Sequence, residues 1–499
     1  MSMSYSTLYS GILLLGLMAG RCEASESSRT FQAPVERNRF IVLTSYDSLQ
    51  AFLGEISRDS AVTLDVIGRS KEGRSITATG FKGTGSPMPA GRLRVLIFAQ
   101  QHGDEPSGKE ALTMLLARCA SGRGPALFEQ LDLRIIPQMN PDGSEHGQRR
   151  TSEGIDLNRS HLLLNSPETV ALHELFASWK PQVTLDVHEY GAYSASWMEG
   201  GFIKGGTVQL GMLTNLNSSE ALRTYQHTAI YPFIAAKMAE AGFAFHEYIV
   251  GSPKERIRHS TTEINDGRQS FGILNTLSFI QEGRQGKTID EDLKSRTLSQ
   301  LTAIEALLVY CNAHAQEIID LVSTERARLP GMGGTKFALR MEHVHAGGTL
   351  RIPVVRLDDG GDTVMSVDPY HDVVRPVCST TVPAGYCIPA SQRAIIDLLK
   401  WHHVEMETVQ TERSMKAETW WIDSVGADVL EEDSLPRPFV RKTREVVTVH
   451  PGDVLVSTRQ WHGVFLPTML EPESMWGLTK YEQFADLLKS KRYPIYRIP

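Results

Sequence analysis

Residues 93–120 read LRVLIFAQQHGDEPSGKEALTMLLARCA, and this stretch decides the fold. Leu93–Phe98 is a short apolar run rich in branched side chains, which predicts a buried strand. Ser107–Ala120 has apolar residues at helical spacing and predicts a helix. The polar turn Gln101–Glu105 lies between them. Strand, polar turn and helix in this order indicate a layered α/β domain.

The same alternation continues on both sides of this stretch, from about Phe40 to Arg328. Short β-branched runs predict strands, and longer segments with apolar residues at helical spacing predict helices that cover a sheet. The further strands expected are Val62–Gly68 and Ser75–Gly80, paired as a hairpin, with Leu131–Ile136 and Val183–Val187; the further helices are Ser219–Ala241 and Asp292–Arg326. One large α/β domain, residues 40–328, accounts for this part of the chain.

A cluster of helix-breaking residues at Leu329–Gly334 marks a change in composition. Beyond it strands and turns dominate, with one helix expected at Pro389–His402 and β-like segments at Val446–Leu455 and Phe465–Leu470. We therefore predict a boundary at this cluster and a smaller, β-rich C-terminal domain over residues 335–499.

The overall composition is that of a folded globular protein, with 499 residues, 41% hydrophobic and 22% charged. The 51 basic residues against 58 acidic ones give a net charge of −7. This balance supplies no electrostatic footprint for a phosphate backbone or an anionic membrane, so nucleic acid is not expected as a partner.

The first residues predict a secretory signal. Ser10–Ala19 is an apolar run too short for a stop-transfer helix, and Cys22–Ala24 offers a cleavage site, so residues 1–24 are expected to be removed. No Lys or Arg precedes the run, and the alternative is a frayed apolar terminus. We expect a secreted or periplasmic protein with no membrane span after signal removal.

Cleavage after Ala24 would leave four cysteines in a compartment where disulfides persist. Cys378 and Cys387 are the pair most suited to a bridge, because Pro383 and Gly385 between them could close a short loop. The remaining two, Cys119 and Cys311, lie in apolar helical contexts that indicate free, buried thiols.

Two polar clusters offer metal ligands. His102 and Glu105, on the turn after the first buried strand, can face one ion with an imidazole and a carboxylate oxygen. His188 lies at the end of the strand that begins at Val183 and supplies a third ligand. Three protein ligands and one open position make a catalytic zinc site, although each residue alone is as well explained by an ordinary polar role.

Two further segments suit substrate chemistry. In the stretch from Arg149 to Arg159, an Arg beside an Asn can grip a carboxylate in two-point fashion, whereas the alternative is a surface loop. Glu282 ends the apolar strand that starts at Asn275. A lone carboxylate there could take a proton from a metal-activated water.

With these residues in order, the chain resembles the zinc metallocarboxypeptidases of the carboxypeptidase A type, in particular large bacterial members with a C-terminal extension. The matching motifs are Val66–Arg74, His102–Glu105, Asn140–Gly143, Gly154–Arg159, Asp186–His188 and Ser278–Glu282. The resemblance covers about Val62 to Gly286 and implies a mixed twisted sheet flanked by helices.

The resemblance also implies a site. His102, Glu105 and His188 would bind one Zn²⁺ per chain, and Glu282 would be the general base and later the acid. Asp156 would orient His102 from behind the metal.

The same family pattern implies a binding role for three more residues. Asn158 and Arg159 would hold the terminal carboxylate of the substrate, and Arg149 would polarise the scissile carbonyl, with Arg150 as the competing residue.

Three features depart from the family pattern. No Tyr lies between Tyr248 and Glu282, so the family's site tyrosine has no clear counterpart. Residues near its expected place are Ser260, His259, His246 and Arg268. Ser160-His161 replaces the usual Asn-aromatic pair, and Glu189 adds a carboxylate beside a ligand.

The predicted function is a zinc-dependent metallocarboxypeptidase. It would hydrolyse the C-terminal bond of peptides with a free terminal carboxylate, using a zinc-bound water activated by Glu282. Two alternatives stay open: a deacylase or amidase of the same scaffold, acting on N-acyl amino acids or cell-wall peptides, and a catalytically silent binding module.

Overall fold

The structure is a computed structural model that describes residues 30–83, 91–122, 128–430 and 433–499. The predicted signal segment, residues 1–24, lies outside the described residues. Within the described ranges, none of the helices has the length and apolar character needed to cross a membrane.

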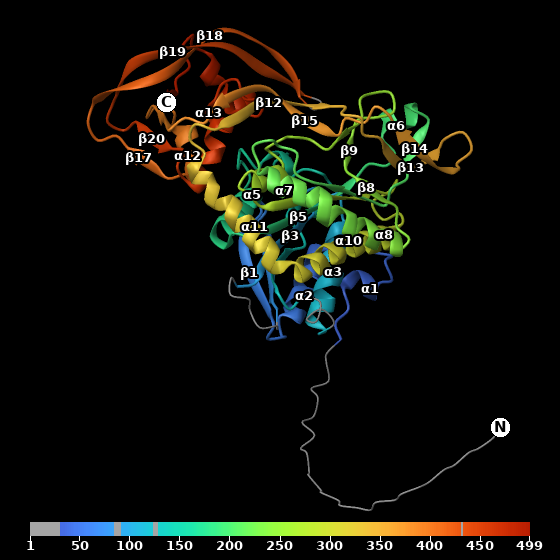
Figure 1. The fold of residues 1–499 in the computed structure, drawn as a ribbon. Coiled ribbons are helices and arrows are strands. Elements are labelled where there is room, and N and C mark those ends of the chain that lie inside the picture. The colour runs from blue at the N-terminus through green and yellow to red at the C-terminus, as the bar shows by residue number, and fades with distance from the viewer. Residues whose placement is uncertain (1–29, 84–90, 123–127, 431–432) are drawn as a thin grey trace, which may run out of the picture.

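A mixed eight-stranded sheet forms the centre of the N-terminal part, in the order β1-β2-β4-β3-β5-β11-β7-β8 (Figure 1). The strands β4, β3, β5 and β11 are parallel neighbours, whereas β1, β2 and β7 run antiparallel to a neighbour. Their bounds are β1 Val62–Arg69, β2 Ser75–Lys82, β3 Leu93–Ala99, β4 Leu131–Ile136, β5 Val183–Tyr190, β7 Val208–Gly211, β8 Phe245–Glu247 and β11 Leu277–Arg284. The predicted α/β class, hairpin and strands are confirmed.

Both faces of this sheet are covered, because successive residues of a strand point to opposite sides. Val95 and Ile97 of β3 belong to one apolar cluster, together with residues of three helices: α2 (Tyr46–Ile56), α3 (Ser107–Ala120) and α10 (Leu293–Ala313). Leu96 and Phe98 belong to a second cluster on the other face, with α5 (Pro167–Trp179) and α9 (Gly267–Gly272). Burial on both faces explains the continuous apolar runs of the central strands.

The predicted helices are present, and two of them are interrupted. The segment Ser219–Ala241 contains α7 (Glu220–Tyr225), a π-helical turn and α8 (Tyr231–Glu240). The segment predicted from Asp292 to Arg326 is α10 followed by α11 (Ala315–Arg328), with the break at His314. The other helices of this part are α1 Pro34–Arg37, α4 Pro141–Glu145 and α6 Ala195–Glu199.

The C-terminal part is rich in strands and arches over the α/β part in Figure 1, where it is coloured orange to red. Its six-stranded sheet has the order β17-β20-β16-β21-β18-β19. The bounds are β12 Lys336–Val344, β13 Leu350–Arg356, β14 Asp362–Val367, β15 Val373–Thr381, β16 Gly385–Ile388, α12 Arg393–Trp401, β17 Met406–Thr408, β18 Arg413–Leu430, β19 Asp433–Val449, β20 Val454–Ser457, α13 Phe465–Leu470 and β21 Tyr496–Ile498.

Two predictions for this part are wrong. The segment Phe465–Leu470 is not β-like: it forms α13, with all six residues buried, and uniform burial cannot distinguish a strand from a buried helix. The pairing of Cys378 with Cys387 is also wrong, since both thiols are free. Cys387 packs in a small apolar cluster with Val409 and Val449. Cys378 packs instead at the edge of the large apolar cluster that contains Leu96, so the two thiols lie in different clusters.

The predicted boundary at Leu329–Gly334 coincides with a short 3₁₀ turn between α11 and β12. The two parts nevertheless share structure. β13 pairs with β6 (Phe202–Lys204) of the α/β part, and Phe337 and Tyr386 lie in the same apolar cluster as Leu96 of the central sheet. The division into residues 40–328 and 335–499 therefore stays a prediction.

Candidate active site

The predicted metal ligands converge at the carboxyl ends of β3 and β5, where ligands bind in open α/β sheets. His102 and Glu105 follow β3, and His188 lies in β5. Glu105 Oε1 is 2.8 Å from His102 Nδ1, and Glu105 Oε2 is 2.9 Å from His188 Nδ1. All three residues are buried, and one ligand atom from each lies within 4.8 Å of the others.

The surroundings of these ligands fit a zinc ion. The other ring nitrogen of His102, Nε2, is 3.0 Å from Asp156 Oδ1, and Nε2 of His188 is 2.9 Å from Asp186 Oδ1. A carboxylate behind each ring favours the proton on Nε2 and turns the Nδ1 lone pair inward. The two Nδ1 atoms are only 3.2 Å apart, and a shared cation relieves the repulsion between their lone pairs. Two imidazoles and a carboxylate are the donor set of a catalytic zinc site.

Glu282 stands beside this group on the neighbouring strand, β11, opposite His188 in the strand register. Its carboxylate opens on the same pocket as two of these residues, His102 and Glu105. Burial raises the pKa of Glu282 to about 7. A carboxyl with a pKa near neutrality suits a group that accepts a proton and later returns it.

The structure distinguishes Arg149 from Arg150. Arg149 lines the pocket, where its Nε donates to Asp156 Oδ2 at 3.0 Å and its Nη1 lies 3.4 Å from Glu105 Oε1. Arg150 is exposed and donates to the carbonyl of Gly154 instead. Arg149 is therefore the arginine placed to reach a substrate group beside the metal ligands.

Asn158 and Arg159 line the same pocket from the 3₁₀ turn Leu157–Arg159, whose first N–H groups are capped by Asp156. Asn158 Oδ1 accepts from the backbone N–H of Gly267 at 2.9 Å, which fixes the orientation of the amide. Arg159 Nε lies 3.2 Å from Glu263 Oε2, and the Arg159 side chain as a whole is 43% exposed to solvent. Both side chains are thus held in place with donors still available.

The pocket encloses about 370 Å³ and has a second wall that the sequence did not indicate. Tyr190, Trp197 and Lys204 form one side of it, and a loop with Tyr248 forms another. The sequence offered no clear counterpart of the family's site tyrosine, yet the structure brings Tyr248 to the pocket. The residues near the expected tyrosine position do not line it: Ser260 is buried and receives a hydrogen bond from the buried guanidinium of Arg268, and His246 and His259 are buried elsewhere.

The other two departures have structural roles. Glu189 turns its carboxylate to Arg296, 2.7 Å away, and to the backbone N–H of Ser107. His161 is buried with its Nε2 at 2.8 Å from Gln101 Oε1, and burial lowers its pKa to about 4. Glu189 is therefore neutralised by a cation and His161 is uncharged at neutral pH.

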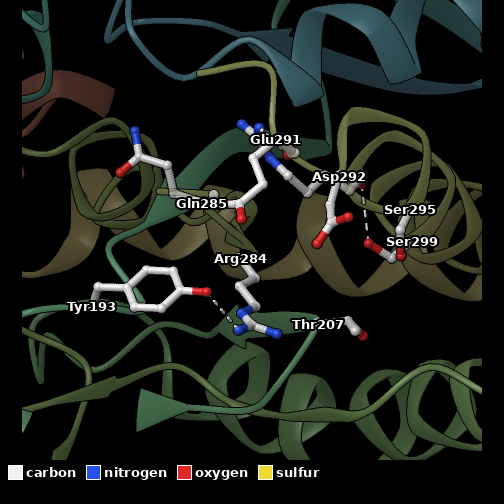
Figure 2. A pocket seen from close by; sticks show the side chains of 10 residues that line it. Tyr193, Thr207, Arg284, Gln285, Glu291, Asp292, Ser295 and Ser299 are labelled. Carbon is white, nitrogen blue, oxygen red and sulfur yellow. Dashed lines mark hydrogen bonds between the residues drawn. The ribbon is translucent and has the colours of Figure 1, made fainter. Parts of the chain in front are cut away.

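A second, smaller cavity of about 50 Å³ lies at the end of β11 (Figure 2). Arg284 and Tyr193 point toward one another there, with Arg284 Nη2 3.3 Å from the Tyr193 hydroxyl. Asp292 and Ser299 lie across the cavity. This volume is sufficient for a few water molecules.

Comparison with known proteins finds several that are similar to this chain. Residues 49–228 match the family model described as zinc carboxypeptidase. Carboxypeptidase 2 from Trichophyton rubrum is 24% identical over 470 residues, which cover 91% of this chain and 86% of that protein. Carboxypeptidase E from Caenorhabditis elegans is 32% identical over 139 residues, 24% of this chain and 29% of that protein. A solved metallo-carboxypeptidase from Burkholderia cenocepacia is 20% identical with a TM-score of 0.42, over 54% of this chain and 69% of that one.

The matched segment defines the class. Residues 49–228 match a zinc carboxypeptidase domain, and this match together with the carboxypeptidase relatives supports a metallocarboxypeptidase, a hydrolase of peptide bonds. The resemblance drawn from the ordered motifs is confirmed at this level. The family is zinc-dependent, whereas the roles of the individual residues remain predictions.

Proposed function

We propose that the protein removes the C-terminal residue from peptides with a free terminal carboxylate, with Glu282 as the general base. One observation supports this most directly. His102, Glu105 and Glu282 line the same pocket as Asn158 and Arg159, the residues proposed to bind the terminal carboxylate. The third ligand, His188, lies directly beside Glu105. A carboxylate anchor and a hydrolytic centre in one cavity select the bond nearest the peptide terminus.

Each residue has a defined task in this proposal. Asn158 and Arg159 hold the terminal carboxylate and so place the last peptide bond beside Glu282. A Zn²⁺ held by His102, Glu105 and His188 supplies a Lewis acid for the carbonyl and the attacking water.

The proton movements belong to two side chains. Glu282 takes a proton from the attacking water and delivers it to the amine that leaves, which its pKa of about 7 permits in both directions. Arg149 donates an N–H to the oxygen on which negative charge develops.

The test is mass spectrometry of a mixed peptide library incubated with the zinc-loaded protein, with free and amidated C-termini in parallel. We expect loss of single residues from free-carboxylate peptides only, and no loss with Glu282→Gln. The control Glu240→Gln, on the exposed surface of α8, should retain activity. Cleavage of amidated peptides at an equal rate would contradict the proposal, and cleavage of N-acyl amino acids alone would support the deacylase alternative.

The same proposal assigns a role to each part of the chain. We infer that residues 40–328 carry the catalysis, that residues 335–499 form an accessory part, and that residues 1–24 direct export to the periplasm or the medium. N-terminal sequencing of the exported protein should begin at Ser25. Retention of Met1 in the exported protein would refute the cleaved signal.

A further inference from the structure

Lys204 is a charged residue of the pocket wall with no assigned role. It ends β6, a short strand in the segment between β5 and β7. Its Nζ lies 5.1 Å from the ring centre of Tyr190 and 5.4 Å from that of Trp197. Two aromatic faces attract an ammonium group at such distances and hold it in one place.

The ammonium of Lys204 differs from the other two cations of the pocket in its partners. Arg149 bonds Asp156, and Arg159 is paired with Glu263. Across the described residues, no hydrogen bond and no ion pair reaches Nζ of Lys204, although most of this side chain is removed from solvent. A largely buried ammonium with no direct hydrogen-bond or ion-pair partner is costly, so an anion arriving beside it gains a strong interaction.

The backbone of Lys204 is fixed by the C-terminal part of the chain. Lys204 pairs with Val354 of β13, and the N–H of Gly205 donates to the carbonyl of Pro353 at 2.9 Å. Behind this pairing, Trp197 packs in an apolar cluster with Ile352 and Val354. The cation is therefore held at a fixed point of the wall, as a binding site requires.

The position of Lys204 relative to the reacting bond follows from Glu282. Both residues line the same cavity of about 370 Å³, and the negative charge of Glu282 acts on the ammonium. Glu282 must lie at the scissile bond, so the groups nearest Lys204 belong to the residues on either side of that bond. The terminal carboxylate is not among them, because Asn158 and Arg159 hold it.

We propose that Lys204 is a specificity residue that binds the carboxylate of an acidic side chain at one of the two residues joined by the scissile bond. This inference rests on the proposed carboxypeptidase function. The ligand is a Glu or Asp side chain of the peptide, either on the terminal residue or on the penultimate one. The ammonium of lysine acts as a point charge and does not require the two-point geometry of a guanidinium. It can therefore bind the carboxylate of either Glu or Asp.

The experiment compares kcat/KM for two pairs of N-acetylated peptides with the zinc-loaded protein: Ala-Ala-Ala-Glu against Ala-Ala-Ala-Gln, and Ala-Ala-Glu-Ala against Ala-Ala-Gln-Ala. We expect at least one pair to favour Glu by about tenfold or more, as for a charge-assisted hydrogen bond. The pair that does so identifies the recognised residue. In Lys204→Met the ratio should fall to about 1, and Lys204→Arg should keep most of it.

The matched control is Lys287→Met. Lys287 is exposed and lies 5.2 Å from the ring of Tyr193, so this change also removes a lysine from an aromatic face without touching the pocket. It should keep the wild-type ratio. A wild-type ratio near 1 in both pairs, or a preference for Glu that survives in Lys204→Met, overturns the inference.

Failure of the proposed carboxypeptidase function would give a different result from failure of this inference. In that case no single residue is released from any of the four peptides, and their binding to the zinc-loaded protein is measured by calorimetry instead. Tighter binding of a Glu peptide, lost in Lys204→Met, would then support Lys204 as an acid-binding residue of another reaction. Equal binding of Glu and Gln peptides would overturn it.

Discussion

At the scale of single residues, Asp156 connects the predicted metal ligand His102 to Arg149, the arginine proposed to polarise the scissile carbonyl. It accepts from Nε2 of His102 and from Nε of Arg149. Burial opposes the charge of Asp156, but the hydrogen bond from His102 and the charge of Arg149 outweigh it and hold the pKa of this carboxyl well below its usual range. Asp156 is therefore a carboxylate at neutral pH.

Asp156→Asn should therefore weaken zinc binding by about 10- to 100-fold, the usual effect of losing a carboxylate behind a ligating histidine. Dialysis against a competing chelator, followed by metal analysis, measures the change. Asp290→Asn, a substitution in the exposed loop before α10, is the control and should leave the affinity unaltered. Equal zinc retention in Asp156→Asn and the wild type would rule out the orienting role.

The charge of Lys204 predicts how the preference for Glu over Gln peptides depends on pH. Burial lowers the pKa of Lys204 to about 8, and the charge of Glu282 on β11 partly counters this. The other groups around it are the uncharged rings of Tyr190 and Trp197 and the imidazole of His246, whose pKa burial lowers to about 4.

Only protonated Lys204 attracts a carboxylate, so the preference for Glu over Gln should be full below about pH 8 and decline as the pH rises through that value. The ratio of kcat/KM for the two peptides, measured from pH 6 to 10, checks this. Lys204→Arg should keep the preference to the top of the range, because arginine stays charged. The same decline in Lys204→Arg would assign the effect to another group.

The sequence revealed one half of the site and not the other. His102, Glu105 and His188 follow strand patterns that bring them to one edge of a sheet, so their meeting could be anticipated. Lys204 ends the three-residue strand β6, and its position depends on pairing with Val354, far away in the sequence. Tyr248 likewise reaches the pocket through the path of a loop, which no periodic pattern encodes.

At the scale of elements, a buried ion pair ties α10 to β5 at Glu189, the residue next to the predicted metal ligand His188. Arg296 of α10 donates through Nε and Nη2 to Glu189 of β5, at 2.9 and 2.7 Å. Both side chains are almost completely buried. Removing one partner of such a pair leaves an uncompensated charge in a low-dielectric interior.

Arg296→Met should thus lower the free energy of unfolding by about 3–5 kcal/mol, as for other broken buried pairs. The double variant Arg296→Met with Glu189→Gln should recover much of the loss, because no charge is then left behind and the amide oxygen can still accept from Ser107. Urea unfolding of the wild type, both single variants and the double variant completes the cycle. Additive losses would show that the two side chains do not act as a pair.

Helices and strands whose apolar residues recur with a clear period were predictable from the sequence. Elements defined by tertiary packing were not. The spacing of apolar residues located α3 to the residue and all but the end of β3. Phe465–Leu470 was misassigned because a helix buried on every side has no polar face to reveal its period. The π-helical turn between α7 and α8 carries no signal of its own, since every residue within it is compatible with an α-helix.

At the scale of the whole molecule, the C-terminal part is built into the core of the α/β part. Trp461 stacks on Phe176 of α5 with ring centres 6.0 Å apart, and His402 bonds the carbonyl of Leu162 at 2.7 Å. Together with the β6–β13 pairing, these contacts join segments on both sides of the predicted boundary. The change in composition at Leu329–Gly334 marked where the strands begin and could not show that the core continues across it.

A shared core has a thermodynamic consequence. Segments that bury each other's apolar surface lose stability together, so the metal-free protein should unfold in one calorimetric transition with equal calorimetric and van't Hoff enthalpies. A chain ending at Gly334 would expose Phe176 and Leu96 with their neighbours and should fail to fold, as judged by near-ultraviolet circular dichroism. Trp461→Ala is the milder variant: it should lower the single transition temperature without splitting the transition, since the stacking on Phe176 is lost while the rest of the shared core remains. Two separate transitions in the wild type, or a folded and active chain ending at Gly334, would show instead that the α/β part is independent and that the C-terminal part only covers it.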